Sequence, residues 1–202
     1  MANKIPKSMF SKWLIDMNNL KADSFHQWIF YPGMLFGSMD TWWGKTGNRS
    51  GPHEGLDICY YEDLKGKMHR IGPTTKIAAM YHGIVYNISD DDFIGQSIYV
   101  IHPQFKNCSG DTLCTVYAHA RAYEGILEGT AIHVSDIIAE VADFRKAGSS
   151  MTDHLHLSMA YLPAQISKTN MNWKTMANPD MVTLLNPLDY IECRYNLKAY
   201  RK

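Results

Sequence analysis

The chain has 202 residues, of which 46% are hydrophobic and 20% are charged, as in an ordinary folded globular protein. Its 20 Lys and Arg residues equal its 20 Asp and Glu residues, so the formal net charge is zero. Because this balance leaves no excess of basic residues for a polyanion, we expect no nucleic-acid partner. The length suits one domain with short extensions and a sizeable core.

The four cysteines include no Cys-x-x-Cys pair, which disfavours a cysteine-rich zinc site. Cys108 and Cys114 flank a short turn, and the sequence leaves open whether they form a disulfide or remain thiols. Charges at Lys7, Lys12 and Asp16 interrupt the N-terminal apolar groups, so we expect no signal peptide, and no apolar run is long enough to span a bilayer. These features predict a cytoplasmic protein or one exported by another route, and the oligomeric state stays open.

The first part of the chain is predicted to be an N-terminal helical or irregular extension, residues 1–36. Apolar residues recur at helical spacing over residues 5–20, which predicts a helix that packs on the core or acts as a lid or partner-binding element. Residues 37–52 are rich in Gly, Ser, Thr and Asn and are predicted to form a long loop. This loop contains Trp42 and Trp43, which could line a cleft or fill the core.

Residues 55–160 contain short runs rich in Ile, Val, Tyr and Leu, separated by turn residues. Without long helices between them, these runs favour a mainly β fold over residues 37–195, a compact antiparallel sandwich or barrel-like core. Asn186 and Pro187 resemble the cap and first turn of a short helix over 188–194, and residues 196–202 form a basic tail. The predicted strands are 56–61, 76–80, 83–89, 96–102, 113–119, 131–134, 137–142 and 154–161.

The last of these strands carries a His-x-His pair. Because side chains alternate between the two faces of a strand, His154, His156 and Ser158 share one face, opposite apolar neighbours. Imidazoles on the polar face of a buried strand need partners, and a metal ion supplies one. An isolated His-x-His pair is nevertheless a weak signal.

A His-x-x-x-Asp motif precedes the first predicted strand. His53 and Asp57 are separated by an even number of residues, so an extended chain directs both side chains to the same side. On a helix the same spacing could be a surface pair, but Gly55 and the β-branched context argue against a helix.

A third strand carries Thr115, Tyr117 and His119, which strict alternation places on one face. Taken alone, a histidine at a strand end is more often structural than catalytic. The three motifs together are more informative, since two His and one Asp form a normal ligand set for a catalytic zinc with one position left for water. Two further histidines would then be available to transfer protons.

The order of these motifs resembles that of the lysostaphin-type (LytM-type) zinc endopeptidases, from about Gly37 to Ile191. The resemblance implies a compact antiparallel fold of the duplicated hybrid motif type. It also implies cleavage of peptide bonds, typically in the cross-links of bacterial peptidoglycan or in glycine-rich peptides.

The resemblance also implies a role for each site residue. His53, Asp57 and His156 match the ligands of one zinc ion, Zn2+, and His119 and His154 match the two catalytic histidines. The resemblance does not determine which of His119 and His154 acts as the general base.

Some positions depart from the family pattern. Leu157 and Ser158 stand where the family usually has Phe and Glu, Ser135 stands where glycine is common, and Arg49 could be the counterpart of a family arginine. His102 ends a strand and could be structural or lie near the site. The alternatives to a peptidoglycan endopeptidase are a non-catalytic binding or regulatory protein on this scaffold, or a zinc hydrolase with a substrate outside the wall.

Overall fold

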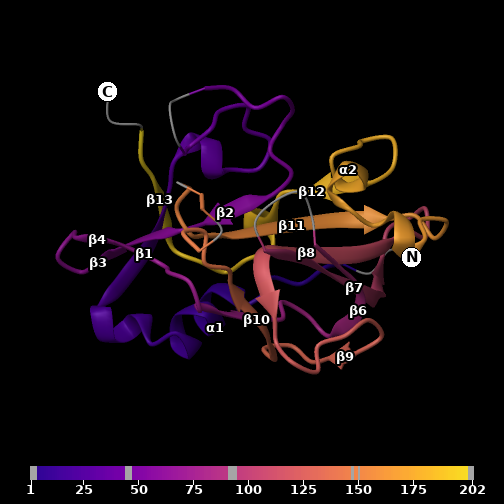
Figure 1. Cartoon of the computed structure of the whole chain (residues 1–202), viewed down its shortest axis with the longest axis horizontal. Coiled ribbons are helices and arrows are strands. Elements are labelled where there is room, and N and C mark those ends of the chain that lie inside the picture. Colours follow the sequence, from indigo (N-terminus) through magenta and orange to yellow (C-terminus); the bar gives the residue numbers. More distant parts are fainter. Residues whose placement is uncertain (1–3, 44–46, 91–94, 147, 150, 200–202) are drawn as a thin grey trace.

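The computed structural model describes residues 4–43, 47–90, 95–146, 148–149 and 151–199, whose strands form two sheets (Figure 1). No helix in these ranges has the length and apolar character needed to cross a bilayer. The α-helices are α1 (Phe10–Met17) and α2 (Trp173–Met176), and 3₁₀ turns lie at Leu20–Asp23, Pro32–Met34, Lys168–Asn170 and Pro187–Asp189. The strands are β1 (Phe25–Phe30), β2 (Leu56–Ile58), β3 (Tyr60–Asp63), β4 (Met68–Arg70), β5 (Lys76–Ala78), β6 (Gly83–Asp90), β7 (Gln96–Lys106), β8 (Thr112–Ala122), β9 (Ala131–Ile132), β10 (Ile137–Val141), β11 (Leu155–Leu162), β12 (Thr183–Leu185) and β13 (Tyr195–Leu197).

The larger sheet is antiparallel and has the order β12-β11-β8-β7-β6-β9. Its two longest strands, β7 and β8, lie side by side, and β11 pairs with β8 on one side and with β2 and β12 on the other. Strand β10 pairs with the end of β8 and with β5. Each predicted strand has a counterpart, but the one predicted over 56–61 is divided at Cys59 into β2 and β3, which lie in different sheets. The mainly β antiparallel fold is confirmed, with open sheets and no closed barrel among the described residues.

The smaller sheet has the order β13-β1-β3-β4, with β1 and β13 parallel (Figure 1). Its strand β1 has the sequence FHQWIF, whose aromatic and β-branched residues suit a strand. This strand lies within the segment expected to be helical or irregular, while α1 is shorter than the helix expected over residues 5–20. The boundary at residue 36 and the other domain limits stay predictions.

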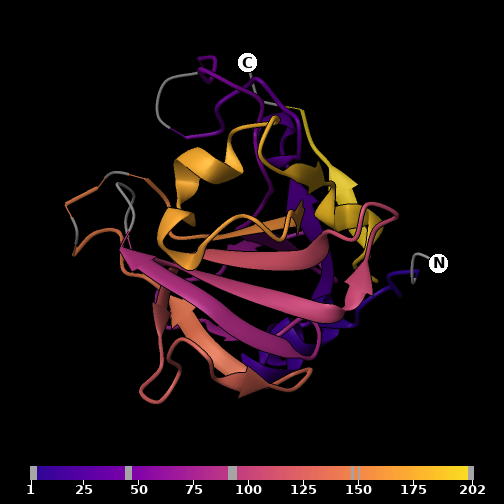
Figure 2. The same ribbon diagram turned by 90° about the vertical axis from the view of Figure 1, so that its right-hand side faces the viewer.

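The core covers both faces of the larger sheet. One face packs against α1 and the smaller sheet through buried residues such as Phe10, Trp28 and Leu157. The other face packs under the segment that contains α2, where Val116 and Ala160 meet Met176 (Figure 2). The sheet is therefore buried over most of both faces, and a polar site on it requires a gap in this cover.

The C-terminal part differs from the sequence prediction. Asn186 accepts a hydrogen bond from the Leu188 amide (3.2 Å), as its capping role predicts, but only the 3₁₀ turn Pro187–Asp189 follows. The helix predicted over 188–194 is wrong, because the chain instead forms a parallel bridge from Ile191 to Ser8. The tail includes β13, and residues 200–202 lie outside the described residues. Exposed Cys108 and buried Cys114 are both free thiols.

Candidate metal centre

The centre is built on a cross-strand pair of β2 and β11. Asp57 of β2 lies directly opposite His156 of β11, and neighbours in a ladder project to the same face. His53 lies just ahead of β2, where its amide donates to the Ser38 carbonyl (3.0 Å) and its carbonyl accepts from the Gly37 amide (2.8 Å). Two segments far apart in the sequence are thus fixed against each other by backbone hydrogen bonds.

The donor atoms of the three predicted ligands converge. His156 Nδ1 lies 2.8 Å from Asp57 Oδ1 and 3.1 Å from His53 Nε2, and His53 Nε2 lies 3.2 Å from Asp57 Oδ1. Tetrahedral zinc with bonds of about 2.0–2.1 Å separates its ligand atoms by about 3.3 Å. The three atoms therefore have nearly the spacing that a zinc ion requires.

The outer nitrogen atoms of the histidines support this interpretation. His53 Nδ1 donates to the Leu35 carbonyl (3.0 Å), so in the neutral ring Nε2 carries a lone pair that points inward. His156 Nε2 lies 2.7 Å from Ser158 Oγ, which leaves Nδ1 for the interior. Such outer partners are the usual way in which a protein orients metal-binding imidazoles.

The protonation states of Asp57 and His156 favour the binding of a cation. Burial alone would raise the pKa of Asp57, but the neighbouring charges and hydrogen bonds, chiefly from His53 and His154, hold it well below its usual range. Burial lowers the pKa of His156 to about 4 and also lowers the pKa of His154. An ionised Asp57 carboxylate beside a neutral His156 imidazole is the form in which these two residues would bind a metal.

His154 lies beside the three ligand residues. Its Nδ1 donates to the Thr152 carbonyl (2.8 Å), so the neutral ring directs a lone pair on Nε2 inward, 3.7 Å from Asp57 Oδ1. Its ring packs against those of His119 and Phe144, with centroid distances of 4.7 and 5.2 Å. His154 and His119 are therefore adjacent, as a pair that transfers protons requires.

His119 reaches this site through a β-bulge. Between two consecutive pairings with β7, strand β8 has two residues, Ala118 and His119, where β7 has one, Ser97. His119 takes a left-handed conformation with φ of 58°, which is uncommon for a residue other than glycine. The sequence prediction that Tyr117 and His119 share a face is wrong, because the bulge reverses the alternation and Tyr117 points into the core.

The sequence named Trp42 only as a residue that could line a cleft or fill the core, Arg49 only as the possible counterpart of a family arginine, and Trp173 not at all. Trp42 Nε1 donates to Asp57 Oδ2 (2.6 Å), and Arg49 Nη2 lies 3.4 Å from the same oxygen. Trp173 of α2 places its ring edge-on to that of His156, with a centroid distance of 4.8 Å. No spacing rule links these residues to the motifs, because they come from a loop and from the irregular segment after β11.

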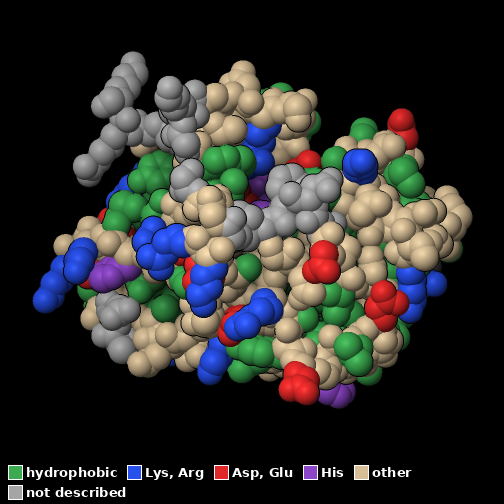
Figure 3. All heavy atoms as spheres, in the orientation of Figure 1, with side chains coloured by type: hydrophobic (Ala, Val, Ile, Leu, Met, Phe, Trp, Pro, Cys, Tyr) green, Lys and Arg blue, Asp and Glu red, His purple; other side chains and the backbone are tan. Residues whose placement is uncertain are grey.

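The site opens into a cavity of about 380 Å³, and Figure 3 shows histidine atoms in a hollow on the face that it displays. Aromatic, charged and small residues line the cavity: Thr41, Trp43, Arg49, Ser50, Gly51, Glu54, Met151, Trp173, Lys174 and Ala177, together with Asp57 and the histidines. His119, His154 and His156 line the opening and are accessible to a ligand there, although His154 and His156 are nearly buried.

His102 does not belong to the site. It pairs with Leu113 across the ladder and so faces the core, on the opposite side of the sheet from His156. Its Nδ1 donates to the His82 carbonyl (2.7 Å), and its Nε2 lies 3.0 Å from Thr115 Oγ1. Burial lowers its pKa to about 4, so it is a neutral core residue.

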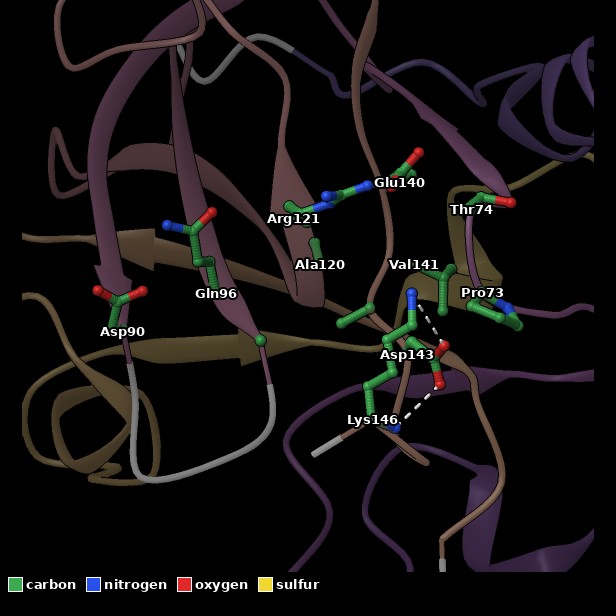
Figure 4. Close-up of a pocket in the computed structure, with 12 residues that line it drawn as sticks. Pro73, Thr74, Asp90, Gln96, Ala120, Arg121, Glu140, Val141, Asp143 and Lys146 are labelled. Atoms are coloured by element: carbon green, nitrogen blue, oxygen red, sulfur yellow. Dashed lines mark hydrogen bonds and ion pairs between the residues drawn. The ribbon is translucent and has the colours of Figure 1, made fainter. Parts of the chain in front are cut away.

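A second hollow, of about 820 Å³, lies where β7 begins and β10 ends (Figure 4). It adjoins the strand end that carries His119, whose carbonyl accepts a hydrogen bond from the Ala142 amide (2.9 Å). Its described lining contains neither histidine nor cysteine, so it offers no metal site comparable to the first. It contains two ion pairs, Arg121 with Glu140 and Lys146 with Asp143.

Fold and site together define a mainly β protein with buried His, Asp and His residues that could hold a metal ion. No protein-family model and no curated protein sequence matches the chain. Among solved structures, the solution structure of lysostaphin has 18% identity and a TM-score of 0.49, over 92% of this chain and 54% of that chain. The chain thus spans about half the length of that lysostaphin.

In two other solved structures the match extends over a larger share of the other chain. The catalytic domain of the prophage-encoded M23 protein EnpA from Enterococcus faecalis has 17% identity and a TM-score of 0.42, over 71% of this chain and 82% of that one. LytU has 16% identity and a TM-score of 0.43, over 74% of this chain and 90% of that one. The chain resembles lysostaphin-type (M23) proteins in structure as it does in motif order. With TM-scores below 0.5 and identities below 25%, these likenesses carry no argument about this chain, and function has to follow from the site.

Proposed function

We propose that this chain is a zinc-dependent metallopeptidase. The observation that carries the proposal is the convergence of inward donor atoms from His53, Asp57 and His156, beside the two further histidines His119 and His154. Lone pairs this close repel one another unless a cation or a proton lies between them. A centre with three protein ligands and an open side is typical of catalytic zinc sites.

The ligands would be His53 Nε2, Asp57 Oδ1 and His156 Nδ1, and a bound zinc would supply an acidified water and polarisation of the scissile carbonyl. Nε2 of His154 carries a lone pair that can accept the proton of the attacking water. The other histidine, His119, can stabilise the developing oxyanion or protonate the leaving amine, and the reverse assignment uses the same two groups.

The substrate that we propose is a peptide, in the cross-links of peptidoglycan or in a glycine-rich sequence. Its support is the order of the sequence motifs, together with the residues that line the opening. Trp43 and Trp173 line the cavity with aromatic surface, and Glu54 and Lys174 contribute opposite charges. Such a lining suits a short polar backbone more than an extended apolar side chain.

The test is a metal and activity measurement on the full chain. Bound zinc should be close to one ion per chain, and hydrolysis of purified peptidoglycan or of glycine peptides should stop with a chelator and return with zinc. His154→Ala should keep the zinc and lose hydrolysis by about 100-fold or more, because a general acid–base group contributes that much.

Three results would contradict the proposal. Absence of bound zinc would remove the metal centre altogether, and normal turnover by His154→Ala would remove the role of His154. Zinc without cleavage of either substrate would favour a non-catalytic protein or a hydrolase with another substrate.

A further inference from the structure

Asp57 has an outer oxygen that faces away from the histidines. Oδ1 lies among His53, His154 and His156, while Oδ2 accepts a hydrogen bond of 2.6 Å from Trp42 Nε1. Asp57 is almost completely buried, with 2% of its side-chain surface exposed. A buried carboxylate oxygen without a donor would cost several kcal/mol, so this indole N–H is a substantial part of its environment.

Arg49 is the weaker partner of the same oxygen. Its Nη2 lies 3.4 Å from Asp57 Oδ2 but 3.1 Å from the Gly33 carbonyl, and its guanidinium stacks on Trp43 at 4.4 Å from the ring centroid. The guanidinium thus contributes charge near Asp57, whereas the short, directed hydrogen bond comes from Trp42.

Trp42 also contacts the catalytic side of the site. Its ring meets that of His154 edge-on, with a centroid distance of 5.0 Å, and lies 6.0 Å from the ring of Tyr60. The loop that carries it is closed by a hydrogen bond of its own, from the Thr41 amide to the Gly47 carbonyl (2.9 Å). One side chain therefore touches both a predicted ligand and a predicted catalytic histidine.

We propose that Trp42 is a positioning residue of the zinc centre. Its N–H holds Oδ2, so that Asp57 presents only Oδ1 to the metal, and its ring fixes the plane of His154. This inference rests on the proposed zinc site. It assigns the positioning of Asp57 and His154 to a residue that is not itself a metal ligand. A role of Trp42 in packing alone would require its ring but not its N–H, and a role in stability alone would not change zinc affinity among folded proteins, which makes these roles separable from positioning.

The experiment compares Trp42→Phe with Trp13→Phe, which removes an indole N–H from α1, at a residue that does not line the cavity of the centre. Zinc affinity is measured by competition with a chelating indicator at fixed pH, and thermal stability is measured on the chelator-treated proteins. We expect Trp42→Phe to bind zinc about 10- to 100-fold more weakly, as for other outer partners of metal ligands. Trp13→Phe should keep the wild-type zinc affinity. Trp42→Phe should lower the metal-free melting temperature, because buried Asp57 Oδ2 loses a donor, so the affinities are compared at a temperature at which every metal-free protein is folded.

Equal zinc affinity of Trp42→Phe and wild type would overturn the inference, and wild type without zinc would instead overturn the proposed function. A second measurement covers the case in which Trp42→Phe fails to fold. In wild-type protein with 15N-labelled indoles, zinc addition should shift the N–H resonance of Trp42 and leave that of Trp28, which donates to Ser11 (2.7 Å), in place. An unmoved Trp42 resonance in zinc-loaded protein would equally overturn the inference.

Discussion

Gly55 lies where the backbone ahead of β2 passes closest to the ring of His156. A Cβ atom at this position would lie 2.7 Å from His156 Nε2 and 2.7 Å from Ser158 Oγ, and closer still to the Leu157 carbonyl oxygen. That carbonyl belongs to β11, which pairs with β2 and cannot withdraw without breaking the ladder. The residue is therefore glycine because two strands and an imidazole meet there, and not because of its backbone angles.

We expect Gly55→Ala to displace His156 or β2 by several tenths of an ångström. Zinc affinity should fall at least about tenfold, and the free energy of unfolding should fall by about 1–3 kcal/mol, as for other overpacked positions. Denaturant unfolding and zinc competition measure both effects. Gly72→Ala is the control, because a Cβ at Gly72 meets nothing within 4 Å; equal behaviour of the two variants would contradict this explanation.

At the scale of elements, the segment before residue 37 is built into both the core and the site. Strand β1 pairs with β3, and its Trp28 is buried and donates to Ser11. The carbonyls of Gly33 and Leu35 accept hydrogen bonds from Arg49 and His53. No described residue of the segment lines the cavity of the centre, so we expect its removal to unfold the domain and not to open a blocked cleft.

The prediction for this element concerns Trp28. Trp28→Ala should lower the free energy of unfolding by about 3–5 kcal/mol, because it removes a large buried aromatic side chain. The matched control is Leu64→Ala, which truncates a side chain that is 71% exposed beyond the end of β3 and should change stability by less than about 0.5 kcal/mol. Urea unfolding measures the difference, and similar losses in both variants would show that β1 is not part of the core in solution.

At the scale of the whole molecule, stability should depend on pH through the buried histidines. The unfolded chain titrates its histidines near pH 6.5, whereas the folded pKa of His102 is about 4. Above pH 6.5 both states hold a neutral His102. As the pH falls from 6.5 to 4, only the unfolded chain takes up this proton, so the folded state loses stability.

The loss due to His102 between pH 6.5 and 4 should be about 3 kcal/mol, from a pKa difference of about 2.5 units. His102→Gln should flatten the dependence of the unfolding free energy on pH in this window, even if its stability at pH 7 is lower. The measurement is urea unfolding with a chelator present, so that metal uptake does not contribute. Leu64→Ala, which removes no titratable group, should leave the slope unchanged, and an unaltered slope in His102→Gln would contradict the assignment.

The sequence by itself determined the antiparallel β class and the order of the chemical motifs. Side chains alternate between the two faces of a strand, so the sequence alone predicts that His154, His156 and Ser158 lie on the same face. The even spacing of His53 and Asp57 was read in the same way. These predictions concern residues whose geometry is set by their own strand or by its immediate extension.

Only the tertiary structure decided which distant groups complete the centre. His119 joins it through a bulge with a left-handed residue, which local propensity does not predict for histidine. Trp42 and the Leu35 carbonyl arrive from loops whose path is set by packing, and β1 is a strand because β3 and β13 lie beside it. Periodicity describes one element at a time, whereas a hydrogen bond to Asp57 or to His53 depends on how separate elements are placed.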